Sequence, residues 1–374
     1  MHNQKLDSLQ VLRGFAACAV VLHHALRALT VKLPDSLDKA GSAWAPSGAF
    51  VELGAMGVDV FFILSGFLMV YIAEPYFAGR RSPLHFLKQR LFRIWPLYAF
   101  VTAFMCAQLA FEALQTGTLP FDLTLARLGS FIFLPSFNEN GLLQPILGVG
   151  WTLNYEMYFY LLFAAILVSG PRFAVLKLGV ALATAFLVGL LLPPSAVGVF
   201  LSNPIVFEFL LGALVAAGLT SKRFRPRYPA AWISAGVGLA LLFALTPDAL
   251  TPNGWNGSRV LYYGAPALLI FIGFLAFAPN MKWPHWIRLI GDASYSIYLV
   301  HILVIYRVAF RIFPVVEPSA LSQMSIVIAA SAALVASIVA GLATYFLIER
   351  PVVSLLRKGS FDLNARRMLR GREA

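Results

Sequence analysis

Ten apolar stretches, each close to the length of a membrane-spanning helix, run through this chain of 374 residues. A helix needs about 20 predominantly apolar residues to cross the hydrocarbon layer of a bilayer. Helices are predicted because backbone groups in lipid must be satisfied within the segment, and the alternating pattern of a barrel strand is absent. The stretches cover approximately residues 9–29, 57–73, 95–115, 151–169, 172–192, 199–219, 229–246, 259–278, 290–314 and 321–347.

Composition and charge support an all-α, polytopic membrane protein. Hydrophobic residues make up 59% of the chain, charged residues only 12%, and the mean hydropathy is +0.77. The net charge of +12 follows topology: with the N-terminus in the cytoplasm, 21 of the 29 lysine and arginine residues fall on the inner side. This positive-inside bias predicts that both termini are cytoplasmic. The charge therefore indicates membrane orientation, and no nucleic-acid partner is expected.

The sequence predicts one transmembrane domain over residues 1–350, followed by a basic cytoplasmic tail, 351–374, that is too short to fold alone. Cys18 and Cys106 both lie in apolar stretches, so no disulfide framework is indicated. There is no HExxH or CxxC pattern, and no metal site is expected.

The first stretch contains "VLRGFAACAVVLHHA", which places an arginine and two histidines inside a membrane helix. At 100° per residue, Arg13 and His24 differ by about 20° in direction and by about 16 Å along the axis, whereas His23 lies about 80° away from them. Arg13 and His24 can therefore line one cavity. The alternative for either histidine is a hydrogen bond to a neighbouring helix, and for His23 this alternative is favoured.

The second stretch contains "GVDVFFILSGFLM", in which Asp59 is predicted at the outer surface, level with His24. A carboxylate there can orient an imidazole and stabilise its protonated form. The alternative is that Asp59 caps the helix. Ser65 lacks the flanking glycines of a nucleophile elbow, and the pair Ser65–Gly66 instead indicates close helix packing.

Two arginines lie at the predicted cytoplasmic start of the third span, in "HFLKQRLFRIWPLY". Arg90 and Arg93 are three residues apart and share a helix face. Guanidinium groups at this spacing suit bidentate binding of phosphate groups. Lipid headgroups are the alternative ligands, and the pair alone favours them.

The fourth span begins with "GWTLNYEMYFY", which contains the carboxylate of Glu156. With Trp151 and Asn154 beside it, Glu156 is suited to interact with an imidazole or a hydroxyl group. The alternative is an ion pair between helices. The ninth span contains "SYSIYLVH", where Tyr298 and His301 lie on one polar stripe, which indicates either a cavity wall or hydrogen bonds between helices.

Together these stretches resemble the acyltransferase-three family of bacterial membrane proteins, whose members acylate surface polysaccharides. "LDSLQVLRGFAACAVVLHHA" resembles the first-helix signature, an arginine followed by ten residues and a histidine. The segments quoted above resemble the family's second-, fourth- and ninth-helix motifs, and Arg90 with Arg93 resembles its arginine pair. The closing "ERP" resembles its terminal motif, and the matches run in order through almost the whole chain.

The resemblance implies acyl-CoA, usually acetyl-CoA, as a co-substrate, with no tightly bound cofactor. It implies a hydroxyl acceptor on a carbohydrate, either a polysaccharide or a lipid-linked glycan. It further implies that His24 acts in catalysis and that Arg90 and Arg93 contact the donor. The chain resembles the short form associated with exopolysaccharide or O-antigen acetylation. The resemblance therefore implies a protein of the bacterial inner (cytoplasmic) membrane, with membrane lipids among its partners.

A mechanism consistent with these residues threads the donor's pantetheine arm past Arg13 to His24, the expected general base. Asp59 or Glu156 is the expected partner of the imidazole. Tyr298 or Asn154 is expected to donate to the developing oxyanion.

Trp151 is a candidate sugar platform, although aromatic residues are common at membrane interfaces. A proton-coupled transporter or flippase of a glycan or lipid-linked precursor is the main alternative function, because a proton relay needs similar residues. A structural subunit of an export complex is the third reading.

Overall fold

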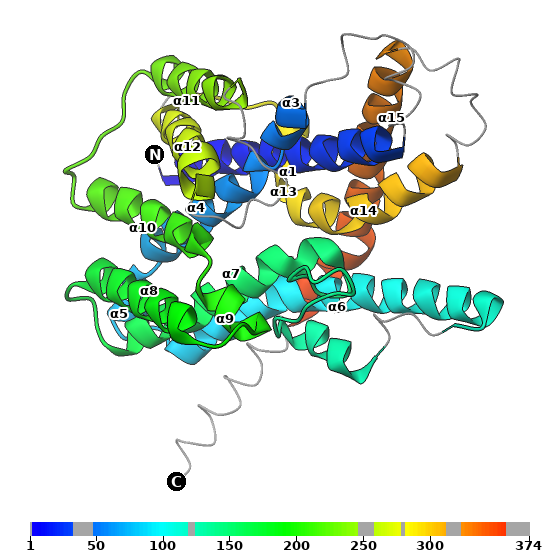
Figure 1. The fold of residues 1–374 in the computed structure, drawn as a ribbon. Helices are drawn as coiled ribbons and strands as arrows, with labels where there is room; N and C mark the ends of the chain where they lie inside the picture. The colour runs from blue at the N-terminus through cyan, green and yellow to red at the C-terminus, as the bar shows by residue number, and fades with distance from the viewer. Residues whose placement is uncertain are drawn as a thin grey trace. The chain divides into compact units, whose positions relative to one another are not determined.

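The computed structural model describes residues 2–32, 48–118, 124–245, 258–277, 281–311 and 323–356. Helices make up most of this part of the chain (Figure 1). Within these ranges, extended segments pair only in one isolated antiparallel bridge, between Phe137 and Leu143. The all-α prediction is therefore confirmed for the described residues.

Eight helices in the described ranges are long and apolar enough to cross a membrane, and a bent pair, His285–Asp292 with Ser294–Tyr306, brings the number to nine. The helix Pro229–Ala244 is also apolar but shorter. These segments account for all ten predicted stretches. The eight spans are Asp7–Leu29, Val51–Tyr71, Pro83–Thr116, Gly148–Val168, Ala174–Leu191, Ala196–Thr220, Val260–Phe277 and Ile326–Leu356.

Large apolar side chains cover the outside of these helices. Leu191 is 85% exposed, Leu347 is 77% exposed and Val168 is 76% exposed. Exposed large apolar side chains on so many helices suit hydrocarbon rather than water. The chain is a multi-pass membrane protein.

The structure divides into two compact units. The first unit comprises the described parts of Met1–Glu74 and Arg172–Gly341, and the second those of Pro75–Pro171 and Leu342–Ala374. The predicted division into one domain over 1–350 and a tail over 351–374 remains a prediction, and residues 357–374 lie outside the described part. The helices of the first unit are α1 (His2–Lys32), α3 (Gly48–Leu53), α4 (Met56–Tyr71), α8 (Ala174–Leu191), α9 (Ala196–Leu201), η4 (Pro204–Val206), α10 (Phe207–Thr220), α11 (Pro229–Ala244), η5 (Val260–Gly264), α12 (Ala265–Phe277), α13 (His285–Asp292), α14 (Ser294–Arg311) and most of α15 (Gln323–Thr344).

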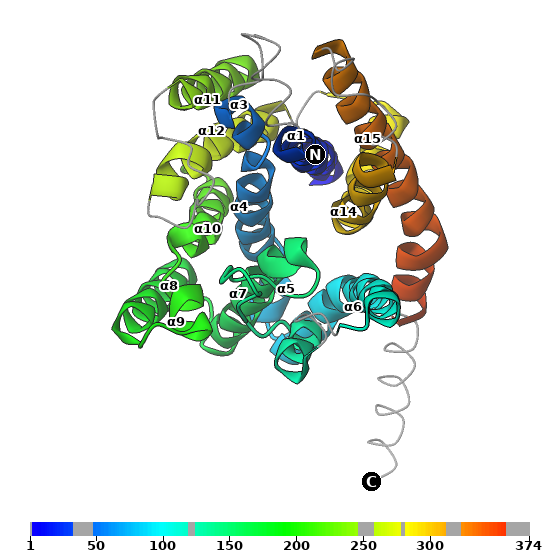
Figure 2. The same ribbon diagram turned by 45° about the vertical axis from the view of Figure 1, so that its right-hand side comes forward.

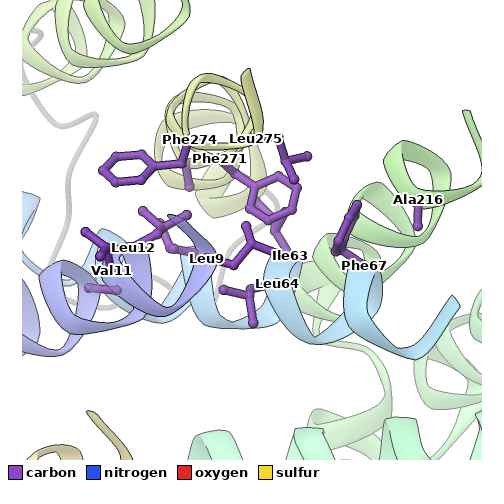
Figure 3. Close-up of a cluster of buried hydrophobic side chains, with 13 residues drawn as sticks. Leu9, Val11, Leu12, Ile63, Leu64, Phe67, Ala216, Phe271, Phe274 and Leu275 are labelled. Carbon is purple, nitrogen blue, oxygen red and sulfur yellow. The ribbon is translucent and has the colours of Figure 1, made fainter. Parts of the chain in front are cut away.

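Helix α1 is the central element of the first unit. It packs against α4, α12, α13 and α14, and Figure 2 shows it nearly end-on between α4 and α14. A cluster of buried apolar side chains joins α1, α4, α10 and α12 (Figure 3). Leu9 and Leu12 of α1, Ile63 of α4 and Phe271 of α12 are all at most 2% exposed in this cluster. Their burial fixes the helix that carries the histidines.

Glycines allow α1 to approach its neighbours at backbone distance. A Cβ atom on Gly291 of α13 would lie 2.0 Å from the carbonyl oxygen of Gln10, and one on Gly57 of α4 would lie 2.3 Å from that of Ala16. Such approach is the usual role of small residues between membrane helices. The two crossings set the position of α1 on both sides.

Two predicted spans differ from the structure. The stretch 290–314 was expected to be one helix, but it is part of the bent pair α13–α14, whose axes meet at 70° next to Ala293. The close contact of Gly291 with α1 ties down α13 just before this bend. The stretch 95–115 begins much earlier than expected, at Pro83, where Ser82 caps the helix by accepting a hydrogen bond from the His85 N–H.

In the second unit, the described helices are α6 (Pro83–Thr116), η2 (Leu125–Ile132), η3 (Gly148–Gly150), α7 (Trp151–Val168) and η8 (Tyr345–Glu349), and the short α5 (Glu74–Phe77) lies at the boundary between the units. Pro96 lies inside α6, which continues through it to Thr116. As a result, Arg90 and Arg93 belong to the body of a 34-residue helix.

Candidate active site

His24 lies on α1 with its ring directed at α14. The side chain is half-buried, and its Nδ1 lies 3.0 Å from the carbonyl oxygen of Val20, one turn earlier. The same Nδ1 lies 3.3 Å from Nε2 of His301, and the two ring centroids are 5.0 Å apart. The structure therefore brings together two histidines that are 277 residues apart in sequence.

His301 is fully buried in α14, and its Nδ1 lies 2.6 Å from the carbonyl oxygen of Tyr298. The polar stripe predicted in this helix faces inward, since Ser294 and Tyr298 are also buried. The ring of Tyr298 packs edge-on against Phe61 of α4, with centroids 6.0 Å apart. The stripe thus lies among α1, α4 and α14, beside His24.

His23 has a different environment from His24, as its position on the helix predicts. It is 6% exposed, and its Nδ1 lies 2.8 Å from the carbonyl oxygen of Val51. Glu52 lies 4.0 Å from the same nitrogen and 3.5 Å from the Arg27 guanidinium. His23 therefore ties α1 to α3, which agrees with the favoured reading of a histidine bonded to a neighbouring helix.

Arg13 is buried on the same continuous helix, eleven residues before His24. It donates a hydrogen bond to Oε1 of Gln10 over 3.1 Å, and Gln10 in turn donates to Oδ1 of Asp292 over 2.8 Å. This chain of contacts links α1 to the end of α13. Because α1 is unbroken between them, Arg13 and His24 lie on one face, about 16 Å apart along the axis.

Asp59 is fully buried, and its ion pair is with Arg259: Oδ2 lies 2.7 Å from Nη2 of that guanidinium. The sequence analysis offered either a contact with His24 or a helix cap. Asp59 does not cap α4, because the N-cap is Ala55 and carries no side-chain hydrogen bond. Its partner is thus one that the sequence analysis did not foresee.

Arg259 and Glu208 are the charged residues that sequence reasoning missed. Glu208 of α10 is fully buried and close enough to Asp59 and Arg259 to interact electrostatically with both, while neither of its carboxyl oxygens has a hydrogen-bond partner within the described ranges. The signal was present in both cases: Glu208 is a lone carboxylate in the apolar run "VFEFLLGALV", and Arg259 begins another apolar run.

The predicted arginine pair lies on α6 in the second unit. Arg90 and Arg93 are both half-buried, and the Arg90 guanidinium lies 5.6 Å from the centre of the Phe86 ring. Nε of Arg90 is buried and has no hydrogen-bond partner within the described ranges. A guanidinium N–H without a partner can donate a hydrogen bond to an anionic ligand.

A pocket of about 160 Å³ adjoins Arg93. This volume is smaller than the roughly 300–1,000 Å³ that encloses a whole small-molecule ligand, so it can hold only part of one. Glu349, from the predicted "ERP" motif, is the second charged residue of its wall. The lining residues are Arg93, Pro96, Leu97, Phe100, Ile348, Glu349, Val352 and Val353.

Helix α7 carries the remaining predicted residues, also in the second unit. Glu156 is half-buried and accepts a hydrogen bond from the Tyr160 hydroxyl, one turn later. Asn154 is 4% exposed, and its Oδ1 has no hydrogen-bond partner in the described part of the chain. Trp151 packs edge-on against Tyr155, with centroids 6.0 Å apart. Glu156 and His24 fall in different units, so a contact between them stays a prediction.

These observations define an α-helical membrane protein with paired imidazoles inside its bundle and two arginines on a separate long helix. The chain belongs to the acyltransferase-three family: the family model, described as an acyltransferase domain, matches residues 6–346. It is therefore a membrane acyltransferase, and a family of this kind implies an acyl donor.

Several curated proteins are similar to the chain along most of its length. It is 33% identical to the "Exopolysaccharide production protein ExoZ" of Rhizobium meliloti over 87% of this chain and 95% of that protein. It is 24% identical to the "O-acetyltransferase OatA" of Staphylococcus aureus over 79% of this chain, and 26% identical to the "Putative peptidoglycan O-acetyltransferase YrhL" of Bacillus subtilis over 81%. The aligned part spans only about half of these last two proteins, 50% and 49%. No solved structure matches the chain significantly.

Proposed function

We propose that this membrane acyltransferase transfers an acetyl group from acetyl-CoA to a hydroxyl group of a surface or exported polysaccharide, near the outer face of the bacterial inner membrane. The arrangement around His24 carries the proposal. Both hydrogen-bond contacts of its ring use Nδ1, and no hydrogen bond to Nε2 is found among the described residues. An imidazole fixed on one nitrogen and available on the other is suited to act as a general base.

In the proposed reaction, Nε2 of His24 takes the proton of the acceptor hydroxyl as its oxygen attacks the thioester carbonyl. The carbon–sulfur bond breaks, and the coenzyme A thiolate leaves and takes up the proton. General bases of this kind contribute about 10²–10⁴-fold to the rate. Tyr298 or Asn154 is the proposed donor to the oxyanion.

The donor assignment rests on the arginines. Arg90 and Arg93 are proposed to bind the phosphates of coenzyme A, because guanidinium groups three residues apart on a helix can share a polyanionic ligand. Arg13, on the same face as His24, is proposed to line the path of the pantetheine arm. The positive-inside bias predicts that the arginine pair lies on the cytoplasmic side, where acetyl-CoA is available.

The acceptor assignment rests on the relatives. ExoZ is named for exopolysaccharide production and OatA for O-acetyl transfer, so a carbohydrate hydroxyl is the acceptor that fits both names. Trp151 is the proposed sugar-stacking residue. The partner of the His24 imidazole was expected to be Asp59 or Glu156. Asp59 instead pairs with Arg259, which weakens its case.

The full chain, reconstituted in nanodiscs with acetyl-labelled acetyl-CoA, tests the proposal. We expect wild type to bind the donor and hydrolyse it slowly. His24→Ala should bind within twofold of wild type and lose about 100-fold in hydrolysis, as expected for loss of a general base. Arg90→Ala combined with Arg93→Ala should weaken donor binding at least tenfold.

Two control variants remove an imidazole and a pair of guanidinium groups outside the proposed site. His285→Ala removes an exposed histidine at the start of α13, and Arg80→Ala with Arg81→Ala removes two exposed arginines before α6. Both should retain binding and hydrolysis. If wild type does not bind acetyl-CoA at millimolar concentration, the donor assignment is wrong. If His24→Ala retains full hydrolysis, His24 is not the base.

A further inference from the structure

The contacts that His24 and His301 make with each other and with two backbone carbonyls determine where the protons of both imidazoles lie. We infer that His301 is a positioning residue for the proposed reaction, because its Nε2 accepts a hydrogen bond from Nδ1–H of His24 and, together with the Val20 carbonyl, fixes the tautomer and direction of that ring. The effect on rate rests on the proposed function. The proton positions follow from the contacts of α1 and α14 alone.

The argument starts at the buried end of the pair. Nδ1 of His301 lies 2.6 Å from the carbonyl oxygen of Tyr298. A carbonyl oxygen only accepts hydrogen bonds, so this Nδ1 carries the hydrogen. A neutral imidazole has one N–H, which leaves Nε2 of His301 as an acceptor. His301 is 0% exposed, and an uncompensated positive charge at such a site is costly, so the neutral form is favoured.

The same reasoning applies to His24. Its Nδ1 lies 3.0 Å from the carbonyl oxygen of Val20, again an acceptor only, and 3.3 Å from Nε2 of His301. A hydrogen on Nδ1 of His24 serves both acceptors. The lone pair of His24 is then on Nε2, the atom that no described residue binds. One set of neutral tautomers therefore satisfies all three contacts.

His301 thus occupies the place that a carboxylate takes in a serine-protease triad, behind the basic imidazole. When His24 takes up a proton on Nε2, its Nδ1–H becomes a charged donor and its bond to His301 strengthens. A neutral acceptor stabilises this cation less than a carboxylate does, but it leaves no unbalanced charge in the membrane when His24 is neutral. With either a carboxylate or a neutral imidazole as the acceptor behind the ring, Nε2 of His24 is the nitrogen that faces the substrate.

Two substitutions at His301 separate positioning from packing. In His301→Gln, the side-chain oxygen can reach the former place of Nε2 and keeps an acceptor there. His301→Leu retains an apolar side chain of similar size but has no acceptor. We expect His301→Leu to lower kcat for acetyl-CoA hydrolysis at least about tenfold with KM within twofold, and His301→Gln to remain within about threefold of wild type.

A double-mutant comparison tests whether His301 acts through His24. In a His24→Ala background, His301→Leu should cause no further loss, because the group that it positions is already gone. Equal losses in both backgrounds would overturn the inference. Equal losses in His301→Leu and His301→Gln would also overturn it, since packing alone would then explain the effect.

¹⁵N-histidine NMR of the full chain in nanodiscs tests the proton positions without any turnover, with the His24→Ala and His301→Gln variants used for assignment. We expect His24 to carry its hydrogen on Nδ1 in wild type and to show a larger fraction of the Nε2-protonated tautomer in His301→Leu, where only the Val20 carbonyl still accepts that hydrogen. A hydrogen on Nε2 of His24, or a tautomer that His301→Leu does not change, would refute the inference. If wild type turns over no acetyl-CoA, the proposed function fails, and the spectra still decide the role of His301.

Discussion

Two buried carboxyl groups, those of Asp59 and Glu208, lie near the guanidinium of Arg259, and the ion pair with it is made by Asp59. Both acids are fully buried, and the Arg259 side chain is 11% exposed. Two carboxylates against a single guanidinium would leave one negative charge unbalanced inside the bundle, which is costly. A proton held by the carboxyl pair restores the balance, as in other sites where two acids share one position. Because Asp59 makes the direct ion pair, Glu208 is the acid expected to hold that proton.

This charge balance predicts unequal effects of substitution. Glu208→Gln replaces a protonated acid by an amide of the same shape, and the midpoint of thermal unfolding should stay close to that of wild type. Arg259→Met leaves Asp59 buried without its cation, and breaking such a pair costs about 3–5 kcal/mol. Tryptophan fluorescence of the detergent-purified variants measures both midpoints. A loss in Glu208→Gln as large as that in Arg259→Met would mean that both carboxyl groups are ionised.

At the scale of helices, the crossing of α4 and α10 shows how closely this bundle is packed. A Cβ atom on Gly66 would lie 1.9 Å from the carbonyl oxygen of Phe209, and one on Gly212 would lie 1.8 Å from that of Ile63. The sequence analysis predicted close packing at Ser65–Gly66, and the contact of Gly66 confirms it. The crossing holds Glu208 of α10 beside Asp59 of α4, so it supports the buried charges as well as the apolar cluster.

Gly66→Ala and Gly212→Ala should each destabilise the protein, because a Cβ at these distances forces two backbones apart. Overpacking of a core costs about 1–3 kcal/mol, and backbone contacts leave little room for relief. Gly238→Ala is the matched control: it also lies in a helix, α11, but a Cβ there meets no atom within 4 Å. Thermal unfolding of the three variants should rank Gly238→Ala highest. An unchanged midpoint in Gly212→Ala would show that α4 and α10 are not in contact as described.

At the scale of the whole chain, the sequence predicts what depends on length and period. Ten apolar stretches correspond to helices, and the common face of Arg13 and His24 follows from the constant rotation of one unbroken helix. The sequence does not predict which residues meet across helices. The position of a residue along its span gives its depth in the membrane, but it does not say which neighbouring helix the side chain faces. Asp59 was expected beside His24 on the basis of level alone, yet α4 directs it to Arg259. The bend next to Ala293 escaped prediction for a related reason, because the stretch 290–314 reads as one continuous apolar segment and its break depends on packing against α1.

Membrane orientation is the property of the whole molecule that the proposed function most requires. The positive-inside bias predicts that Arg223 lies in a cytoplasmic loop and Asn140 in an outer one. Both are exposed, so each can carry a label. With Cys18 and Cys106 replaced by alanine, Asn140→Cys should react with a membrane-impermeant maleimide in cells whose outer membrane is permeabilised and whose inner membrane is intact. Arg223→Cys should react only after the inner membrane is permeabilised.

The opposite pattern would place the arginine pair of α6 on the outer side, away from cytoplasmic acetyl-CoA. The donor proposal would then fail even if His24 proved essential, because no phosphate of coenzyme A could reach Arg90 and Arg93 from within the cell. Labelling of both variants before the inner membrane is permeabilised would indicate that this membrane leaks. A cytoplasmic protein in the same sample is the control, because it is labelled only if the inner membrane leaks. The expected pattern puts the donor's arginines inside, and it leaves the outer end of α1, with His24, as the place where acetyl-CoA and a carbohydrate hydroxyl can meet.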